Sequence, residues 1–545
     1  MSRPHRRLLL VATILTCLLS FVTAARGYPV EWAVSLEKLA SQADIIFKGT
    51  VVSSGEVQDK WFEPYPGFVA RETQFKVVSI LKGESPGDKL AFRHYAKDPQ
   101  PQGYMFQPQF YHFETGRTYL VFATYGGSVG VFRQVWKYHK TKEDQGIFLC
   151  LNGKPVTVGT LKGVVWHELT TMLASPHAND AVYAIRQIDQ MSAGPDAFIG
   201  LSDFDRREVV AGVRGLMTNR ESRIAEAAIG LVGSHNPYMS EERTIYWLAT
   251  VGSGDIPGIG KMNPRMENIG GELYWKDLVA IADSKAPDET RALAILALGL
   301  VREPSLEKLI GRWLTDSAPT VRASAALLLA DFPSPESSKH LTTLAGDAAP
   351  EVRAYVARAA GFAQRIEMVG VLAKLLADKE PKVRQTAAMS LLSFSPKNEG
   401  IAGVFRSQLK NKEFQPLFLI ALAREKPEDY LDALARAVEE KTEPRNFWGG
   451  QIPAFAAWEI LFQYLQSRPV DEVRSGRLNR YLDAMEKVGN YSSSEPRDIY
   501  AFYLQHDMTE RAQKFRRAAN SAASYDLDYY FKQVDPNPSL YRRER

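Results

Sequence analysis

The sequence predicts a multidomain protein: a small all-β barrel at the N-terminus, then an all-α solenoid of helical repeats, then a C-terminal helical cap. Three observations lead to this fold class. A sequence unit recurs every 31 residues between residues 284 and 409, which is typical of stacked helical repeats. Apolar residues alternate with a period of two before residue 158, and they follow helical spacing from residue 161 onward.

Length and composition agree with several packed domains. The chain has 545 residues, of which 45% are hydrophobic, so it can bury large cores. Its formal charge of +4 falls to +1 when the first 24 residues, which carry three arginines, are removed. A nearly neutral chain does not predict a basic face, so no nucleic acid is expected among its partners.

Residues 1–24 have the layout of a secretory signal peptide. A positively charged start precedes an apolar run, Leu8–Val22, and then small residues. The run is too short for a membrane span and no later run is long enough, so no integral membrane span is expected in the mature chain. We predict cleavage after Ala24 or Ala25 and a secreted or periplasmic protein. The paired arginines also occur in twin-arginine signals, but they equally satisfy the ordinary export route.

After removal of the signal, Cys150 is the only cysteine left. No intramolecular disulfide can then form, and the exported fold has to rely on its cores alone. Cys150 lies in an apolar, strand-like stretch, which predicts a buried and inert thiol rather than a reactive one.

Residues 28–158 predict the barrel. A short helix at Ser35–Gln42 precedes stretches in which apolar and polar residues alternate, and glycine-containing turns separate them. The five expected strands lie in ADIIFKGTVVSS, ETQFKVVSILKG, DKLAFRHY, GRTYLVFAT and GSVGVFRQVW. Short strands in this order favour a small antiparallel barrel.

The strand order over residues 43–124, with turns at Lys82-Gly83 and Gly87-Asp88, resembles the netrin-like module. This module is an OB-type barrel that also occurs in tissue inhibitors of metalloproteinases, so the resemblance implies an OB-type barrel with a binding role. In those inhibitors an N-terminal cysteine binds the protease zinc, and disulfides brace the barrel. This chain has neither feature, and inhibition of an extracellular protease is therefore only the third functional hypothesis.

Two stretches inside the predicted barrel are rich in aromatic residues. They form either a contact surface on the barrel loops or a plug that closes one end of the barrel. We favour the plug, because aromatic clusters more often belong to cores. The candidate partner-binding residues here are Trp61, Phe62, Tyr104, Phe106 and Tyr111.

Residues 159–195 predict a helical connector, and residues 196–440 predict the helical repeats. A glycine-rich loop, residues 252–271, comes before the clearest repeats. No strand precedes this loop and no Lys-Ser or Lys-Thr ends it, so a phosphate site is not expected. We predict a flexible or ligand-facing loop, with Trp275 after it as a candidate contact.

The clearest repeats share the pattern D-x-x-P-x-V-R. Small or apolar residues recur four and eight positions apart, on one helix face, and prolines lie in the first helical turn, where a missing N–H costs nothing. Such units cannot bury their apolar face alone, so they must stack. The repeated charges are Asp316, Asp347 and Asp378, together with Arg291, Arg322, Arg353 and Arg384.

Paired helices with this pattern resemble HEAT repeats, in particular the short bacterial type that also occurs in phycobilin lyases. The resemblance covers residues 284–409. It implies a HEAT-type solenoid in which the repeated charges tie one turn to the next, rather than a charged binding strip. The lyase resemblance also offers chromophore attachment, which the export signal and the barrel argue against.

Residues 441–523 predict the C-terminal helical cap, and residues 524–545 predict a tail. Long helices rich in aromatic residues would cover the last exposed core of the repeats. Trp448 precedes two glycines, which marks a second aromatic loop and another candidate contact.

No nucleophile elbow and no histidine pair with metal-binding spacing is evident. We therefore expect no catalytic residues, no metal and no cofactor. The first hypothesis is an exported, non-catalytic scaffold that contacts a protein or envelope partner through its solenoid and its barrel. The second is an exported enzyme or enzyme accessory with a site near the junction of barrel and solenoid.

Overall fold

The structure is a computed structural model of the chain, and it describes residues 35–63, 67–97, 108–128, 130–135, 146–157, 159–191, 204–233, 268–301, 303–440, 452–487, 494–522 and 527–535. The predicted signal peptide and most of the glycine-rich loop lie outside these residues. The chain forms two compact units. One contains Met1–Asn236 and Met266–Val301, and the other contains Pro237–Arg265 and Arg302–Arg545.

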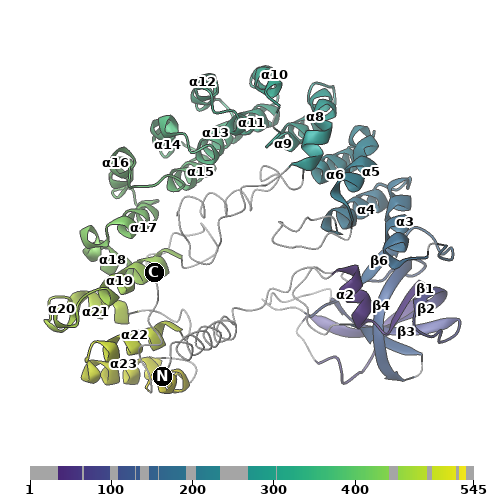
Figure 1. Cartoon of the computed structure of the whole chain (residues 1–545), viewed down its shortest axis with the longest axis horizontal. Helices are drawn as coiled ribbons and strands as arrows, with labels where there is room; N and C mark the ends of the chain where they lie inside the picture. The colour runs from purple at the N-terminus through teal and green to yellow at the C-terminus, as the bar shows by residue number, and fades with distance from the viewer. Residues whose placement is uncertain are drawn as a thin grey trace, which may run out of the picture. The chain divides into compact units, whose positions relative to one another are not determined.

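The described part of the first unit begins with α2 (Leu36–Gln42) and a closed five-stranded barrel (Figure 1). Pairing runs around the barrel in the order β1-β2-β3-β5-β4 and closes from β4 back to β1. All of these pairings are antiparallel except the one between β3 and β5. The strands are β1 (Ile45–Glu56), β2 (Phe68–Lys82), β3 (Lys89–Lys97), β4 (Thr118–Ser128) and β5 (Val131–Gln134).

The prediction of a small N-terminal barrel is thus confirmed, and each predicted strand overlaps an observed one. A sixth strand, β6 (Ile147–Cys150), pairs with β4 outside the circle. It occupies the apolar stretch around Cys150, which was not among the five predicted strands.

Apolar side chains that point inward from each strand fill the barrel. Aromatic rings dominate this core, and Phe113 lies edge-on to Phe75, with 5.2 Å between ring centroids. The turn after β2 needs a glycine: Gly83 has φ +85°, and a Cβ there would lie 2.6 Å from the carbonyl oxygen of Asp44.

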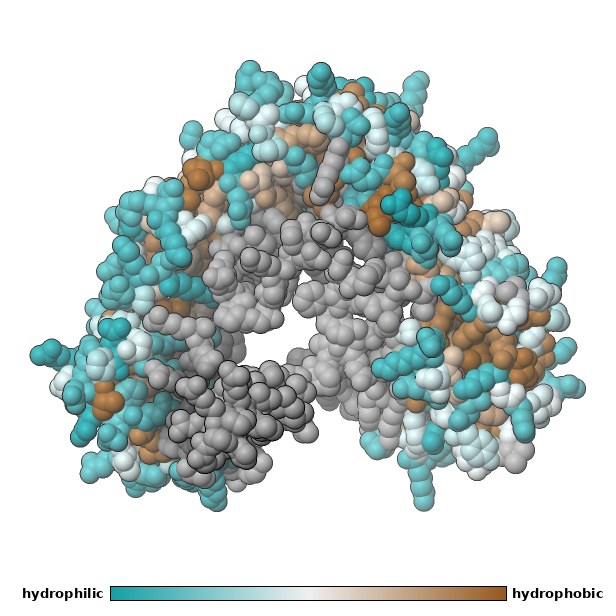
Figure 2. Space-filling model, viewed as in Figure 1, coloured by the Kyte–Doolittle hydropathy of each residue, from teal (hydrophilic) through white to brown (hydrophobic). Residues whose placement is uncertain are grey.

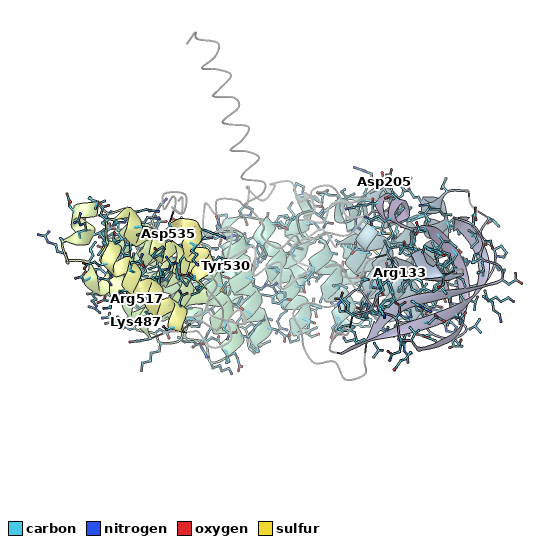
Figure 3. All side chains as sticks on the ribbon, turned by 90° about the horizontal axis from the view of Figure 1, so that it is seen from below. Arg133, Asp205, Lys487, Arg517, Tyr530 and Asp535 are labelled. Atoms are coloured by element: carbon cyan, nitrogen blue, oxygen red, sulfur yellow. The ribbon has the colours of Figure 1, made fainter. Side chains whose placement is uncertain are left out.

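Helices make up the described part of the first unit after β6. In this unit α4, α6 and α9 pack on one another in turn, while α3 pairs with α4 and α8 pairs with α9. The side chain of Asp205 caps α5 by accepting a hydrogen bond from the N–H of Arg207 (Figure 3). The elements are α3 (Leu161–Leu173), α4 (Ala178–Met191), α5 (Arg206–Val213), η1 (Arg214–Thr218), α6 (Ser222–Val232), α8 (Ile269–Ala282) and α9 (Asp288–Ala297).

The second unit begins with helical pairs in two rows (Figure 1). The row of α11, α13 and α15 is continuous, because each helix packs on the next. Each of them begins with a proline in its first turn, as predicted. The repeats contain α10 (Ser305–Trp313), α11 (Pro319–Leu328), η3 (Leu329–Asp331), α12 (Pro335–Leu344), α13 (Pro350–Phe362), η4 (Ile366–Met368), α14 (Val369–Leu375), α15 (Pro381–Leu392) and α16 (Glu399–Gln408).

The interior of this stack is apolar and its surface is not. Val321, Val352 and Val383, which share one frame of the repeat, are fully buried. Figure 2 shows mainly hydrophilic side chains at the surface of the helical parts, with hydrophobic residues between the helices. This is the pattern that stacked amphipathic helices produce.

The predicted helical cap follows. Its core surrounds Trp458, which stacks on Phe462 with 5.0 Å between ring centroids. The predicted repeat region ends with α17 (Gln415–Glu425), η5 (Pro427–Asp429) and α18 (Leu431–Glu439). The cap region contains α19 (Ile452–Gln466), α20 (Val470–Arg474), α21 (Asn479–Glu486), α22 (Ser494–Gln505) and α23 (Thr509–Ala522), and α24 (Asp528–Val534) lies in the predicted tail. Among the described helices of the chain, none has the length and apolar character needed to span a membrane.

Candidate functional site

The repeated charges lie between neighbouring repeats of the second unit. Arg322 forms a bidentate ion pair with Asp347, with both N–O distances at 2.9 Å. Arg353 repeats the contact with Asp378, at 2.7 and 2.8 Å. Hydrogen bonds from these arginines lower the pKa of both carboxyl groups below the ordinary value of 3.8.

Each of these arginines also secures the turn of its own repeat. The Nη1 group of Arg322 donates to the carbonyl oxygens of Asp316 and Ser317, and that of Arg353 donates to the carbonyl oxygens of Asp347 and Ala348. One guanidinium therefore joins two consecutive turns, and we call this series the arginine ladder (Arg322, Arg353 and Arg384).

The ladder changes at its last member. Arg384 binds Glu413 in place of an aspartate, at 2.9 and 3.2 Å, and this pair is more exposed than the one before it. Arg291, which lies in the first unit, binds Asp288 of its own helix and the carbonyl oxygen of Ala282. The ladder side chains are thus occupied by contacts within the protein.

A buried arginine outside the repeat pattern reinforces this stack. Arg365 donates to the carbonyl oxygens of Leu329 and Phe332, at 2.6 and 2.7 Å, and to the hydroxyl of Ser338. It satisfies carbonyl groups at the end of a helix, which have no partner within that helix. No sequence signal pointed to Arg365, because the residues 31 positions away, Ser334 and Pro396, are of other types.

The candidate aromatic contacts differ in their burial. Phe62 and Tyr111 are buried, at 7% and 2% exposure, and Tyr111 belongs to the barrel core. Trp61 is half-buried against Phe62, and the guanidinium of Arg133 on β5 lies over its ring at 4.6 Å. Trp275 is half-buried on α8. Tyr104, Phe106 and Trp448 lie outside the described residues.

A buried histidine lies among the aromatic rings of the barrel core. The Nδ1 atom of His94 lies 2.9 Å from the carbonyl oxygen of Tyr95, which makes Nδ1–H the donor, and Nε2 lies 2.9 Å from the hydroxyl oxygen of Thr73. The pKa of His94 is lowered from 6.5 to about 4, chiefly by burial, and the nearby Arg71 and His112 contribute to this lowering.

His94 should make the stability of the barrel depend on pH. Between pH 6.5 and about 4 the unfolded chain binds a proton that the folded barrel does not bind. We expect the free energy of unfolding to fall by up to about 1.4 kcal/mol for each unit by which the pH is lowered through this range. Above pH 6.5 His94 makes no contribution to this pH dependence. Urea-dependent hydrogen exchange of barrel amides measures this slope.

The substitution His94→Gln should flatten that slope. His167, which is exposed on α3, provides the matched control, since His167→Gln should leave the slope unchanged. A slope that is the same in wild type and His94→Gln would refute the assignment.

An ion pair is buried where the barrel meets α3. The ammonium group of Lys48 on β1 lies 2.6 Å from the carboxylate of Glu168 on α3, and the two side chains are 1% and 9% exposed. Cys150 is buried beside them, and burial together with the Glu168 charge raises the pKa of its thiol. The thiol is therefore protonated and shielded, which is the inert state predicted from the sequence.

The end of the glycine-rich loop has a structural role. The buried amide of Asn268 donates to the carbonyl oxygens of Ala297 and Gly299, each at 2.7 Å, and accepts from the N–H of Gly271. It thus caps the start of α8 and satisfies the end of α9 at once. A Cβ on Gly270 would lie 2.3 Å from the carbonyl oxygen of Val232, so the helix can begin there only with glycine.

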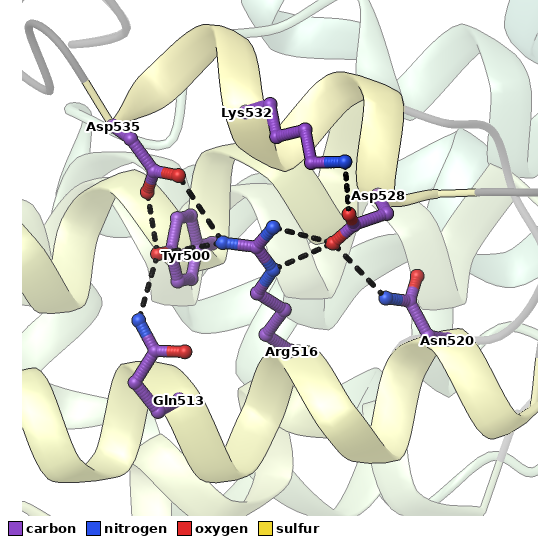
Figure 4. Close-up of polar contacts among 7 residues, drawn as sticks. All are labelled: Tyr500, Gln513, Arg516, Asn520, Asp528, Lys532 and Asp535. Atoms are coloured by element: carbon purple, nitrogen blue, oxygen red, sulfur yellow. Dashed lines mark hydrogen bonds and ion pairs between the residues drawn. The ribbon is translucent and has the colours of Figure 1, made fainter.

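Two polar networks fix the helices of the cap. In Figure 4 the guanidinium of Arg516 lies between Asp528 and Asp535, and the hydroxyl of Tyr500 donates to Asp535 at 2.6 Å. This network holds α24 against α22 and α23. A second arginine, Arg511, binds Glu486 at 2.6 Å and joins α23 to α21 in the same way.

Two concave sites lie among the helices of the first unit. One, with a cavity volume of about 540 Å³, lies between the segment 214–225 and the segment 277–290. Its charged pair, Arg214 and Asp277, is engaged internally at 2.8 Å. The other, with a volume of about 370 Å³, lies between α4 and α6. Within the described parts of the chain, no group of three or more His, Cys, Asp or Glu side chains is arranged to hold a metal ion.

Comparison with known proteins supports the repeat assignment. The HEAT repeat family matches residues 276–361, so this stretch is similar to HEAT repeats. A comparison with curated proteins gives no match.

Among solved structures, an engineered protein is 15% identical with a TM-score of 0.27, covering 64% of this chain and 99% of its own. A mutant of Kap121p is 11% identical with a TM-score of 0.32, over 70% of this chain and 45% of its own. The Pds5-Scc1 complex contains a chain that is 12% identical with a TM-score of 0.27, over 70% of each chain.

Proposed function

We propose that the mature chain is an exported, non-catalytic scaffold that holds a protein partner on its helical repeats. The arginine ladder carries this proposal. HEAT repeats stack into long surfaces that suit protein contact. Here the repeated charges form ion pairs that join one turn to the next. Partner recognition is then left to side chains that do not repeat.

The barrel provides a second, smaller contact region in this proposal. Its closed five-stranded form supports the netrin-like resemblance, and Trp61 and Arg133, which are both half-buried, lie against each other on it. Export rests on the layout of residues 1–24, and the single buried cysteine suits an oxidising compartment because no thiol is left exposed.

The second hypothesis placed an enzyme site at the junction of barrel and solenoid. In the described part of this junction, the space between β1, β6 and α3 is filled by the Lys48–Glu168 pair and the Cys150 thiol. No observation on the described residues favours that reaction site over a packed interface.

Affinity capture with the mature full-length chain, followed by calorimetry with the purified partner, tests the proposal. We expect one protein to be retained in near-stoichiometric amount from the exported fraction and to bind the purified chain with a dissociation constant in the micromolar range or tighter. Turnover of a small molecule, with no protein retained, would contradict the scaffold and support the enzyme hypothesis.

A further inference from the structure

The groove between α4 and α6 has a floor of small residues. Ala227 and Gly230 lie along α6, and a Cβ built on Gly230 meets no atom within 4 Å. Val182 and Ile185 of α4 form the facing wall. Its volume of about 370 Å³ is at the lower end of the range for ligand pockets, and it suits a few side chains of a peptide.

Two arginines line this groove with no polar partner among the described residues. Arg186 comes from α4 and Arg223 from α6, and both side chains are exposed. Because the two helices pack on each other, the arginines face the same opening from its two sides.

The carboxylates of the groove are already engaged. Asp189 binds Arg206, which is largely buried, at 3.0 Å. Glu226 accepts a hydrogen bond from the hydroxyl of Thr290 at 3.1 Å. Three arginines therefore oppose two acids around the groove, and the two arginines that lack partners are those that reach the opening.

We propose that this groove binds an acidic segment of the protein partner, with Arg186 and Arg223 each pairing to a carboxylate. The inference rests on the proposed function and adds the place of contact and the chemistry of the partner. Guanidinium groups form bidentate hydrogen bonds with carboxylates. The small residues on the floor of the groove let the segment approach the surface of α6.

Fluorescence anisotropy with a labelled hexaglutamate peptide and the mature full-length chain tests the groove. We expect hexaglutamate to bind at low ionic strength, and a hexaglutamine peptide to bind at least tenfold more weakly. The double variant Arg186→Gln/Arg223→Gln should weaken hexaglutamate binding at least tenfold. Gly230→Leu, which fills the floor and keeps both charges, should weaken it at least fivefold.

Arg207→Gln is the matched control, because Arg207 is an exposed arginine of the same unit that does not line the groove. It should change the hexaglutamate affinity by less than twofold. The proposal is overturned if hexaglutamate does not bind, or if Arg207→Gln weakens binding as much as the double variant does.

The purified partner separates this inference from the proposed function. If the partner binds the wild type and the double groove variant equally, the groove assignment fails while the scaffold stands. If no partner is retained by the wild type, the scaffold proposal fails, and the hexaglutamate titration still reports on the groove.

Discussion

Replacing Glu168 by glutamine is expected to destabilise the first unit by about 3–5 kcal/mol, because the substitution leaves a buried ammonium group without its counter-charge. Lys48 is 1% exposed, and Glu168 is its charged partner at 2.6 Å. Urea-dependent hydrogen exchange of the amides of β1 and α3 in the full-length mature chain measures the loss.

A double variant separates the buried charge from the packing. Lys48→Met/Glu168→Leu should recover most of the lost stability, because removing both partners leaves no unpaired charge in the interior. The exposed pair of Arg480 and Asp432, whose side chains are 51% and 58% exposed, is the control: Arg480→Gln should cost less than about 1 kcal/mol. A loss below that value for Glu168→Gln would show that the junction admits water and that the pair is not structural.

The substitution Arg353→Ala should destabilise the repeats of the second unit by about 3 kcal/mol, because it breaks a buried bidentate ion pair and leaves the Asp378 carboxylate without its counter-charge. It also removes the donor to the carbonyl oxygens of Asp347 and Ala348. Because the pKa of Asp378 is lowered in the folded chain, the contribution of the pair to stability is present above pH 3.8 and is lost as the pH falls below it. Hydrogen exchange of the α13 and α15 amides measures the effect.

Arg384→Ala gives the matched comparison within the ladder. Its pair with Glu413 is more exposed, at 23% and 38% against 8% and 9% for Arg353 and Asp378. We therefore expect a loss of about 1 kcal/mol or less. If Arg353→Ala left stability unchanged and weakened partner binding instead, the ladder would be a binding strip and not a structural series.

The sequence was sufficient for the architecture because its periodicity is local. The alternation of apolar residues placed the five barrel strands, and the recurrence of proline and valine placed the starts of α11, α13 and α15. Trp313 lies in a frame where other repeats have leucine, and it is buried in the core, at 2% exposure. Each of these signals comes from burying one face of one element.

The contacts that join elements could not be predicted in the same way. Lys48 and Glu168 are 120 residues apart, and their pairing depends on how α3 packs on the barrel. Asn268 belongs to the loop predicted to be flexible or ligand-facing, yet its amide makes three hydrogen bonds within the first unit. Arg516 and Arg511 lie on an unremarkable polar helix, and only the arrangement of α21, α22 and α24 around them shows what they bind.

The central claim is that the helical repeats hold the partner. Hydrogen exchange of the full-length mature chain, with and without the purified partner, tests it most directly. We predict that the partner slows exchange in helices within residues 204–440. The slowed amides should include those of α6 near Arg223, on the side that faces α4. Protection confined to the barrel strands, or no protection at all, would contradict the claim.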